Sequence, residues 1–147
     1  ELVEQTMHDE FTAKYGAPSA KHPVYFYLRP SLDLDAVDRE LRQRRALGET
    51  RTRYLLVDLG EITDTAHISF TVFDSHRSYA ERCPTDAHDP APAMAVERDQ
   101  GTVFRIDEVA EVFARNRHIQ DLSFEVQVWN PSILPPPSRC RLPTARL

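Results

Sequence analysis

This chain of 147 residues has few glycines and cysteines and no long apolar run, and each shortage excludes a kind of site or segment. With only 4 glycines, the chain has no glycine-rich loop that could cradle a phosphate group with backbone N–H groups. No apolar run is long enough to span a bilayer, and no signal-peptide pattern opens the chain. We therefore expect a soluble cytoplasmic protein with no membrane partner and no cofactor.

The two cysteines, Cys83 and Cys140, lie in loop-like segments. They are too few for a disulfide framework, so we expect two free thiols, although a disulfide between them stays open. His76, Cys83 and His88 follow one another closely, but their spacing matches no compact zinc site, and we predict no metal. Because the chain begins with Glu1 rather than methionine, we expect it to be trimmed or excised from something longer.

The charge balance is acidic, with 23 acidic and 18 basic residues and a net charge of −5. This excess argues against nucleic acid as a partner, since phosphate contacts need clustered lysine and arginine. Only Lys14 and Lys21 are lysines, and the scattered arginines are typical of a GC-rich coding genome, which favours a bacterial source. The length and the hydrophobic content of 41% fit one domain with a real core.

Two strands joined by a short polar turn organise the chain. Residues 54–59 and 68–73 are rich in β-branched or aromatic side chains, and 63–66 can form a four-residue loop between them. This loop predicts an antiparallel hairpin in which Leu59 faces Phe70. In that register one face is apolar and the other is mixed, and a slip by one residue would exchange the two faces.

Hydrophobic periods and turn residues predict the remaining elements. The predicted helices are 2–15, 31–47 and 107–116, the further strands are 24–29 and 122–129, and 93–98 with 102–106 form a small hairpin. A long loop over 75–92 and a proline-rich tail over 130–147 complete a single domain, 1–147, whose core spans about 24–129.

The order strand, helix, strand, strand, helix, strand resembles the ferredoxin-like (split βαβ) architecture. The resemblance is one of pattern, not of sequence motif, and covers roughly residues 24–129. It implies an α+β fold with an antiparallel sheet and both helices on one face of that sheet. The helix 2–15 would be an addition that packs on the edge of the domain.

The sheet face opposite the helices would carry large aromatics with a few polar groups, a composition typical of a ligand pocket or an interface. Such a face needs a cover. A second copy in a homodimer, the segment 75–102 or the tail, or a ligand or partner protein could provide it. The residues that we predict to bind a ligand on this face are Tyr25, Tyr27, Arg29, Tyr54, Thr71, Phe73, Gln127 and Trp129.

Acid–base chemistry is the enzymatic function that this face favours. Asp58 and Glu125 would lie on it, and a cover would desolvate both carboxylates and shift their pKa values. His67 and His76 lie near its strand ends and are the candidate proton carriers. These four residues are the predicted catalytic set, acting on a small molecule or peptide without a cofactor.

The alternative is a protein-interaction domain of the acidic immunity or adaptor type, which would use the same face as an interface. RNA binding on strand aromatics is disfavoured, because 68–73 lacks the basic, aromatic-dense strand signature. The shape of the site would distinguish an acid–base enzyme from a protein-interaction domain. A concave site with a histidine within hydrogen-bond reach of a carboxylate favours chemistry, whereas a flat exposed face favours a protein partner.

Overall fold

The computed structural model describes residues 2–28, 34–48, 57–62, 64–80, 82–83, 98–120 and 122–134. The chain divides into two compact units, which are treated separately. The sheet unit comprises residues 1–28 and 64–131, and the second unit comprises residues 29–63 and 132–147. The single domain over 1–147 stays a prediction. Within the described ranges, no helix is long and apolar enough to cross a membrane.

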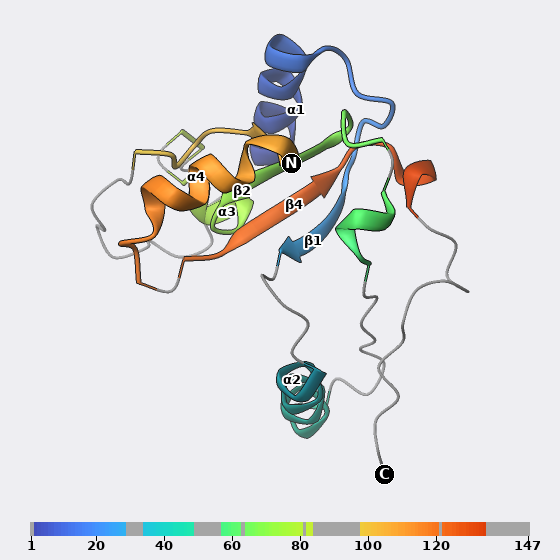
Figure 1. The fold of residues 1–147 in the computed structure, drawn as a ribbon, viewed down its shortest axis with the longest axis vertical. Helices are drawn as coiled ribbons and strands as arrows, with labels where there is room; N and C mark the ends of the chain where they lie inside the picture. Colours follow the sequence, from blue (N-terminus) through green and yellow to red (C-terminus); the bar gives the residue numbers. More distant parts are fainter. Residues whose placement is uncertain are drawn as a thin grey trace. The chain divides into compact units, whose positions relative to one another are not determined.

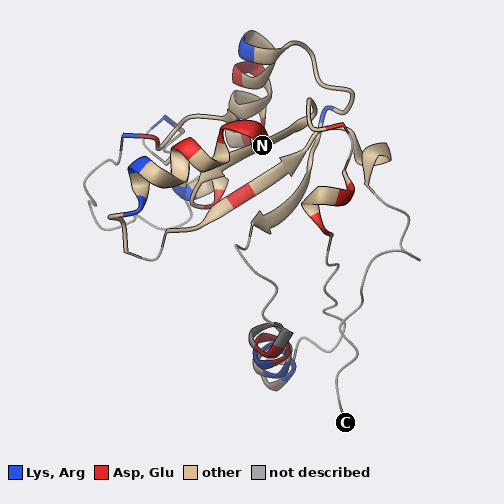
Figure 2. Cartoon of the chain, viewed as in Figure 1, with Lys and Arg blue, Asp and Glu red and all other residues tan. Residues whose placement is uncertain are grey.

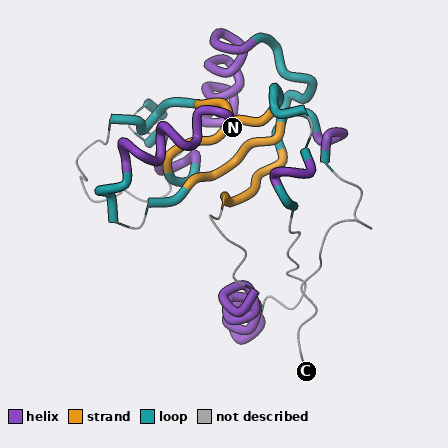
Figure 3. The backbone as a smooth tube through the Cα atoms, in the orientation of Figure 1, coloured by secondary structure: helices purple, strands orange, loops and turns teal. Residues whose placement is uncertain are grey.

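The sheet unit contains a four-stranded antiparallel sheet with helices around it, so the α+β class is confirmed (Figures 1 and 3). Its elements are α1 (Leu2–Tyr15), β1 (Val24–Leu28), β2 (Ile68–Val72), α3 (Ser75–Ser78), β3 (Phe104–Arg105), the 3-10 helix η2 (Ile106–Glu108), α4 (Val109–Asn116) and β4 (Phe124–Val128). The second unit contains α2 (Leu34–Ala46) and the 3-10 helix η1 (Leu59–Glu61), and a further 3-10 helix, η3 (Pro131–Ile133), lies at the boundary.

The strand order differs from that of a simple ferredoxin-like sheet. In that arrangement the first strand lies inside the sheet, between the last strand and the third. Here the order is β1-β4-β2-β3, so the last strand is interior and the first is at the edge of the sheet (Figure 1). The strands 24–29, 68–73 and 122–129 were correctly predicted within one or two residues, but their arrangement was not.

The predicted hairpin is also wrong where the structure describes it. Phe70 pairs with Phe104 of β3 on one side and with Val126 of β4 on the other, so Leu59 has no place opposite it. Leu59 instead begins η1, whose N-cap is Asp58. The Asp58 carboxylate accepts a hydrogen bond of 2.9 Å from the Gly60 N–H, a local turn that competes with strand pairing. Residues 54–56 lie outside the described ranges.

The division of the strands into two faces is confirmed by the register. Ile68, Phe70 and Val72 lie opposite Val128, Val126 and Phe124, which makes one face of the sheet apolar. Helix α4 lies over this face, where the rings of Phe113 and Phe124 are 6.4 Å apart. The other face carries Ser69, Thr71, Glu125 and Gln127.

This second face is not open, contrary to the prediction. Helix α1 covers it, with Val3, Met7 and Phe11 buried at intervals of four residues along the helix. The Phe11 ring packs 5.5 Å from the ring of Trp129, which is fully buried. The core on this side consists of Val3, Met7, Phe11, Tyr79, Cys83, Val103 and Trp129. The helix 2–15 is therefore confirmed as an element, but it covers the sheet instead of packing on its edge.

A chain of hydrogen bonds satisfies the polar groups beneath α1. The Trp129 indole donates to Ser69 Oγ at 2.8 Å, and Ser69 donates to Gln127 Oε1 at 3.0 Å. Gln127 Nε2 donates to Thr71 Oγ1 at 3.2 Å, and Thr71 donates to the Phe73 carbonyl at 3.1 Å. Each hydroxyl both accepts and donates, so these buried groups avoid the penalty of unpaired polar atoms.

Glu10 ties α1 to the segments that follow β2 and precede β3. Its carboxylate accepts four hydrogen bonds, from Lys14 Nζ (2.6 Å), Tyr79 Oη (2.7 Å), Arg82 Nη1 (2.8 Å) and Val103 N (3.0 Å). Burial alone would raise the pKa of Glu10, but these donors outweigh burial and hold the pKa below its ordinary value of 4.5. The ionised form therefore stabilises the attachment of α1.

Replacing Glu10 with glutamine should lower the free energy of unfolding by about 2 to 3 kcal/mol at neutral pH, because a neutral amide binds the Lys14 and Arg82 cations much less strongly. Since the folded state depresses the pKa of Glu10, its contribution is complete above pH 4.5 and is lost as the pH falls through the folded-state value. Urea unfolding from neutral to acidic pH measures both effects.

Asp9→Asn on the same helix is the matched control, because the Asp9 side chain is 68% exposed. We expect it to change the stability by less than about 0.5 kcal/mol. Equal stability of the two variants at neutral pH would contradict the role given to Glu10.

Candidate functional site

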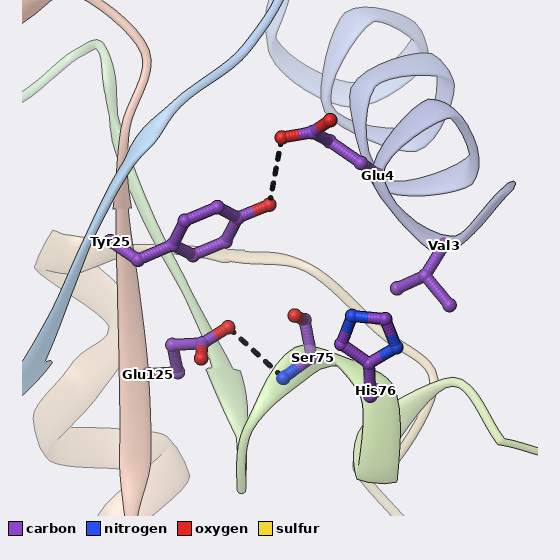
Figure 4. Close-up of a pocket in the computed structure, with 6 residues that line it drawn as sticks. All are labelled: Val3, Glu4, Tyr25, Ser75, His76 and Glu125. Carbon is purple, nitrogen blue, oxygen red and sulfur yellow. Dashed lines mark hydrogen bonds between the residues drawn. The ribbon is translucent and has the colours of Figure 1, made fainter. Parts of the chain in front are cut away.

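A pocket of about 350 Å³ lies between α1, β1, β4 and α3. It is lined by Val3 and Glu4 of α1, Tyr25 of β1, Glu125 of β4, and Ser75 and His76 of α3 (Figure 4). His76 is exposed and Tyr25 is 39% exposed, so the pocket opens to solvent. Three of the predicted site residues, Tyr25, His76 and Glu125, are brought together here.

The strand register places the polar groups of this site. Glu125 lies between Tyr27 of β1 and Thr71 of β2, so it projects from the face that α1 covers. Among the residues of β1, β2 and β4 it is the single charged one, and Figure 2 shows these strands in tan apart from an acidic segment. Tyr25 precedes Tyr27 by two residues on β1, so it lies on the same face.

A turn at Phe73 brings α3 over this face. Phe73 has φ of 64°, a left-handed conformation that a bulky side chain rarely adopts. The conformation is held by a hydrogen bond of 2.7 Å from Phe73 N to the Ser123 carbonyl and by the Arg77 guanidinium, 3.7 Å from the centre of the buried Phe73 ring. Backbone strain of this kind costs roughly 1 to 3 kcal/mol and is often found at functional sites. Here it places Ser75 beside Glu125.

Glu125 is 7% exposed, and its two carboxylate oxygens differ in their surroundings. Oε1 accepts a hydrogen bond of 3.0 Å from the Ser75 N–H. Oε2 accepts none from the residues that the structure describes. Oε2 reaches solvent, since the buried side-chain atoms without a partner in the described part of the chain are His67 Nδ1 and Arg105 Nε. This oxygen is therefore a hydrogen-bond acceptor that remains available beside the pocket.

Glu4 links the pocket to its rim through two contacts. One carboxylate oxygen accepts a hydrogen bond of 3.1 Å from the Tyr25 hydroxyl, and the other lies 2.7 Å from His22 Nδ1. Burial raises the pKa of Tyr25, and the negative charge and hydrogen bond of Glu4 raise it further, with a smaller contribution from the charge of Glu125. Tyr25 is consequently a neutral donor at physiological pH.

Other predicted site residues do not reach this pocket. Thr71, Phe73, Gln127 and Trp129 are buried beneath α1 and α3, and Tyr27 is 60% exposed on the edge strand. Thr71 and Gln127 take part in the hydrogen-bonded chain of the core, apart from the pocket, and a role of these residues in ligand binding stays a prediction.

The remaining predicted residues fall elsewhere. His67 precedes β2, where its carbonyl accepts a hydrogen bond of 2.8 Å from Trp129 N, and its buried Nδ1 has no hydrogen-bond partner among the described residues. Asp58 caps η1 in the second unit. Arg29 and Tyr54 lie outside the described ranges. No group of three or more metal-ligating side chains occurs in the part of the chain that is described.

The sequence-based prediction of the site did not include Val3, Glu4, His22 or Ser75. The signal for the first two was present, because Val3, Met7 and Phe11 form an apolar stripe on a helix that had no assigned partner. Placing that stripe over the aromatic face would have brought the neighbouring Glu4 to the edge of the sheet. Ser75 had no comparable signal, since the turn at Phe73 has no glycine to mark it.

Replacing Glu4 with glutamine should lower the pKa of Tyr25 toward its ordinary value of 10.0, because the charge and the charge-assisted hydrogen bond are both removed. In the unmodified chain, the stability linked to Tyr25 is complete below pH 10.0 and is lost as the pH rises further. The pH titration of the Tyr25 ring resonance, assigned with Tyr25→Phe, measures the pKa. An unchanged titration in Glu4→Gln would refute this coupling, and Glu111→Gln, 81% exposed on α4, is the control.

The chain was compared with the known protein families, with curated proteins and with solved structures. None of the three comparisons gives a match. The chemistry of the pocket is therefore the basis on which a function can be assigned.

Proposed function

We propose that this chain is a ligand-binding domain that holds a group of a small molecule or peptide in the pocket between α1 and the sheet. The observation that carries the proposal is Glu125, a residue that is 7% exposed, lines a cavity of about 350 Å³ and accepts one hydrogen bond from the described residues, on Oε1. Electrostatic interactions are stronger at such a little-exposed charge than at the protein surface. A ligand that donates a hydrogen bond to Oε2 would there replace water.

Helix α1 covers the second face of the sheet, and this changes how a ligand would be held. A homodimer was predicted because an open aromatic face needed a cover, but α1 provides that cover within one chain. We therefore propose that one chain forms the complete site. The pocket is concave and bounded by two carboxylates, which favours a small group over a flat protein interface.

Binding through Glu125 has a direct test. Glu125→Gln preserves an acceptor for the Ser75 N–H but removes the charge, so a ligand held by this carboxylate should bind at least tenfold more weakly. A mixed library of small cationic, neutral and anionic compounds can be screened by the shift of the Ser75 amide resonance. The control is Glu111→Gln, whose carboxylate lies on α4.

Compounds that move the Ser75 resonance equally in the unmodified chain and in Glu125→Gln would contradict the role of Glu125. A library from which no compound saturates this resonance would overturn the binding function itself. The Trp129 indole resonance reports on the fold in both variants, because its N–H is bonded to Ser69 in the core.

Acid–base catalysis is the second candidate, favoured by the contacts His22–Glu4 at 2.7 Å and Tyr25–Glu4 at 3.1 Å. A carboxylate that orients a histidine on one side and a neutral tyrosine donor on the other is an arrangement that can transfer protons.

If a bound ligand is a substrate, the protein should accelerate the exchange of its carbon-bound protons with deuterated solvent. The acceleration should fall at least a hundredfold in Tyr25→Phe. Binding without any exchange or turnover would leave a binding domain and exclude this second function.

A further inference from the structure

The chain of buried hydrogen bonds beneath α1 ends at the turn that leads into one wall of the pocket. Its last link is the Thr71 hydroxyl, which accepts a hydrogen bond of 3.2 Å from Gln127 Nε2 and donates one of 3.1 Å to the Phe73 carbonyl. Helix α3 begins two residues after Phe73 and contributes Ser75 and His76 to the pocket (Figure 4). The hydrogen-bonded chain therefore connects the core of the sheet unit to the position of α3.

Two residues that face each other across the strands hold the two ends of this turn. Thr71 of β2 lies opposite Glu125 of β4 in the register, so both side chains project from the same face of the sheet. Thr71 bonds the Phe73 carbonyl at the start of the turn, and the Glu125 carboxylate accepts the Ser75 N–H at 3.0 Å at its end. The backbone over 73–75 is thus attached to the sheet at both ends.

The turn has to be held, because the left-handed backbone of Phe73, with φ of 64°, is unfavourable for a bulky residue. An extended Phe73 would instead prolong β2. The Phe73 N–H is held by the Ser123 carbonyl at 2.7 Å, and the Phe73 carbonyl is held by Thr71. These two bonds fix the peptide groups on either side of Phe73. Without the second bond, the peptide group that leads toward α3 would lose the restraint that sets its direction.

We infer that Thr71 is a positioning residue of the pocket: its hydroxyl holds Phe73 in the left-handed conformation and thereby keeps the Ser75 N–H on Glu125. The inference rests on the proposed binding function, to which it adds a residue that does not line the pocket and acts through its wall. A valine at position 71 would suit a strand equally well. The hydroxyl, and not the branched shape of the side chain, is therefore the group that carries this role.

Amide hydrogen exchange of the ligand-free protein tests the inference. The amide of Val126, on the interior strand β4, is the internal reference, because its exchange requires the sheet to open. Thr71→Val keeps the branched shape of the side chain but removes its hydroxyl. We expect this change to raise the ratio of the Ser75 exchange rate to the Val126 exchange rate at least tenfold. A general loss of stability would accelerate both amides together and leave the ratio unchanged.

Two further variants serve as controls. Thr71→Ser retains the hydroxyl and should leave the ratio within about twofold of that of the unmodified chain. Ser69→Ala removes a hydroxyl from the other end of the same hydrogen-bonded chain, at a residue that is fully buried and is bonded to Trp129 and Gln127. It should destabilise the core without changing the ratio, because Ser69 does not contact Phe73.

An unchanged ratio in Thr71→Val would overturn the positioning role and leave the binding function to the compound library, which decides it separately. Rises of equal size in Thr71→Val and in Thr71→Ser or Ser69→Ala would also overturn it, because the effect would then not belong to the Thr71 hydroxyl. The unmodified chain gives a test that depends on no variant. Its Ser75 amide should exchange at least tenfold more slowly than the same amide in a peptide of residues 71–79, and equal rates would contradict a turn held in this position.

Discussion

The hydrogen bond between the Trp129 indole and Ser69 is the constraint on which the sheet unit depends. It is one end of a chain of buried polar groups on β2 and β4, and these groups have to be kept from water. Helix α1 does so with Phe11 against the Trp129 ring. The attachment of α1 in turn relies on the Glu10 carboxylate, which gathers donors from three parts of the chain. Burial and hydrogen bonding therefore support each other, since neither would persist without the other.

The local elements were predictable because their patterns are local. Helix 2–15, strand 24–28 and strand 124–128 follow from periods of four or two residues, and the division of strands into two faces follows from alternation. The order of the strands does not follow from such patterns. Nothing in residues 68–73 states that Phe70 pairs with the two-residue strand at Phe104, a pairing set by long-range contacts.

The candidate site, too, could be predicted only in part from local sequence patterns. Tyr25, His76 and Glu125 were selected from the sequence by residue type and strand face, and they do line one pocket. Gln127 and Trp129 were selected by the same argument and are core residues. What separates the two sets is the footprint of α1, which covers one end of the face and leaves a gap beside Glu4. A face assigned by alternation does not reveal where a helix from elsewhere in the chain will end.

Two little-exposed carboxylates of the sheet unit, Glu10 and Glu125, show how a structural group can be told from a functional one. Glu10 accepts four hydrogen bonds, which leaves nothing for a ligand to add, and its pKa lies below its ordinary value. Glu125 is 7% exposed and accepts one hydrogen bond from the described residues, on Oε1, while Oε2 is accessible to solvent. A donor from a ligand can take the place of water at that oxygen, whereas the four donors around Glu10 leave no such position. The difference in hydrogen bonding therefore favours Glu125 over Glu10 as the carboxylate that meets a ligand.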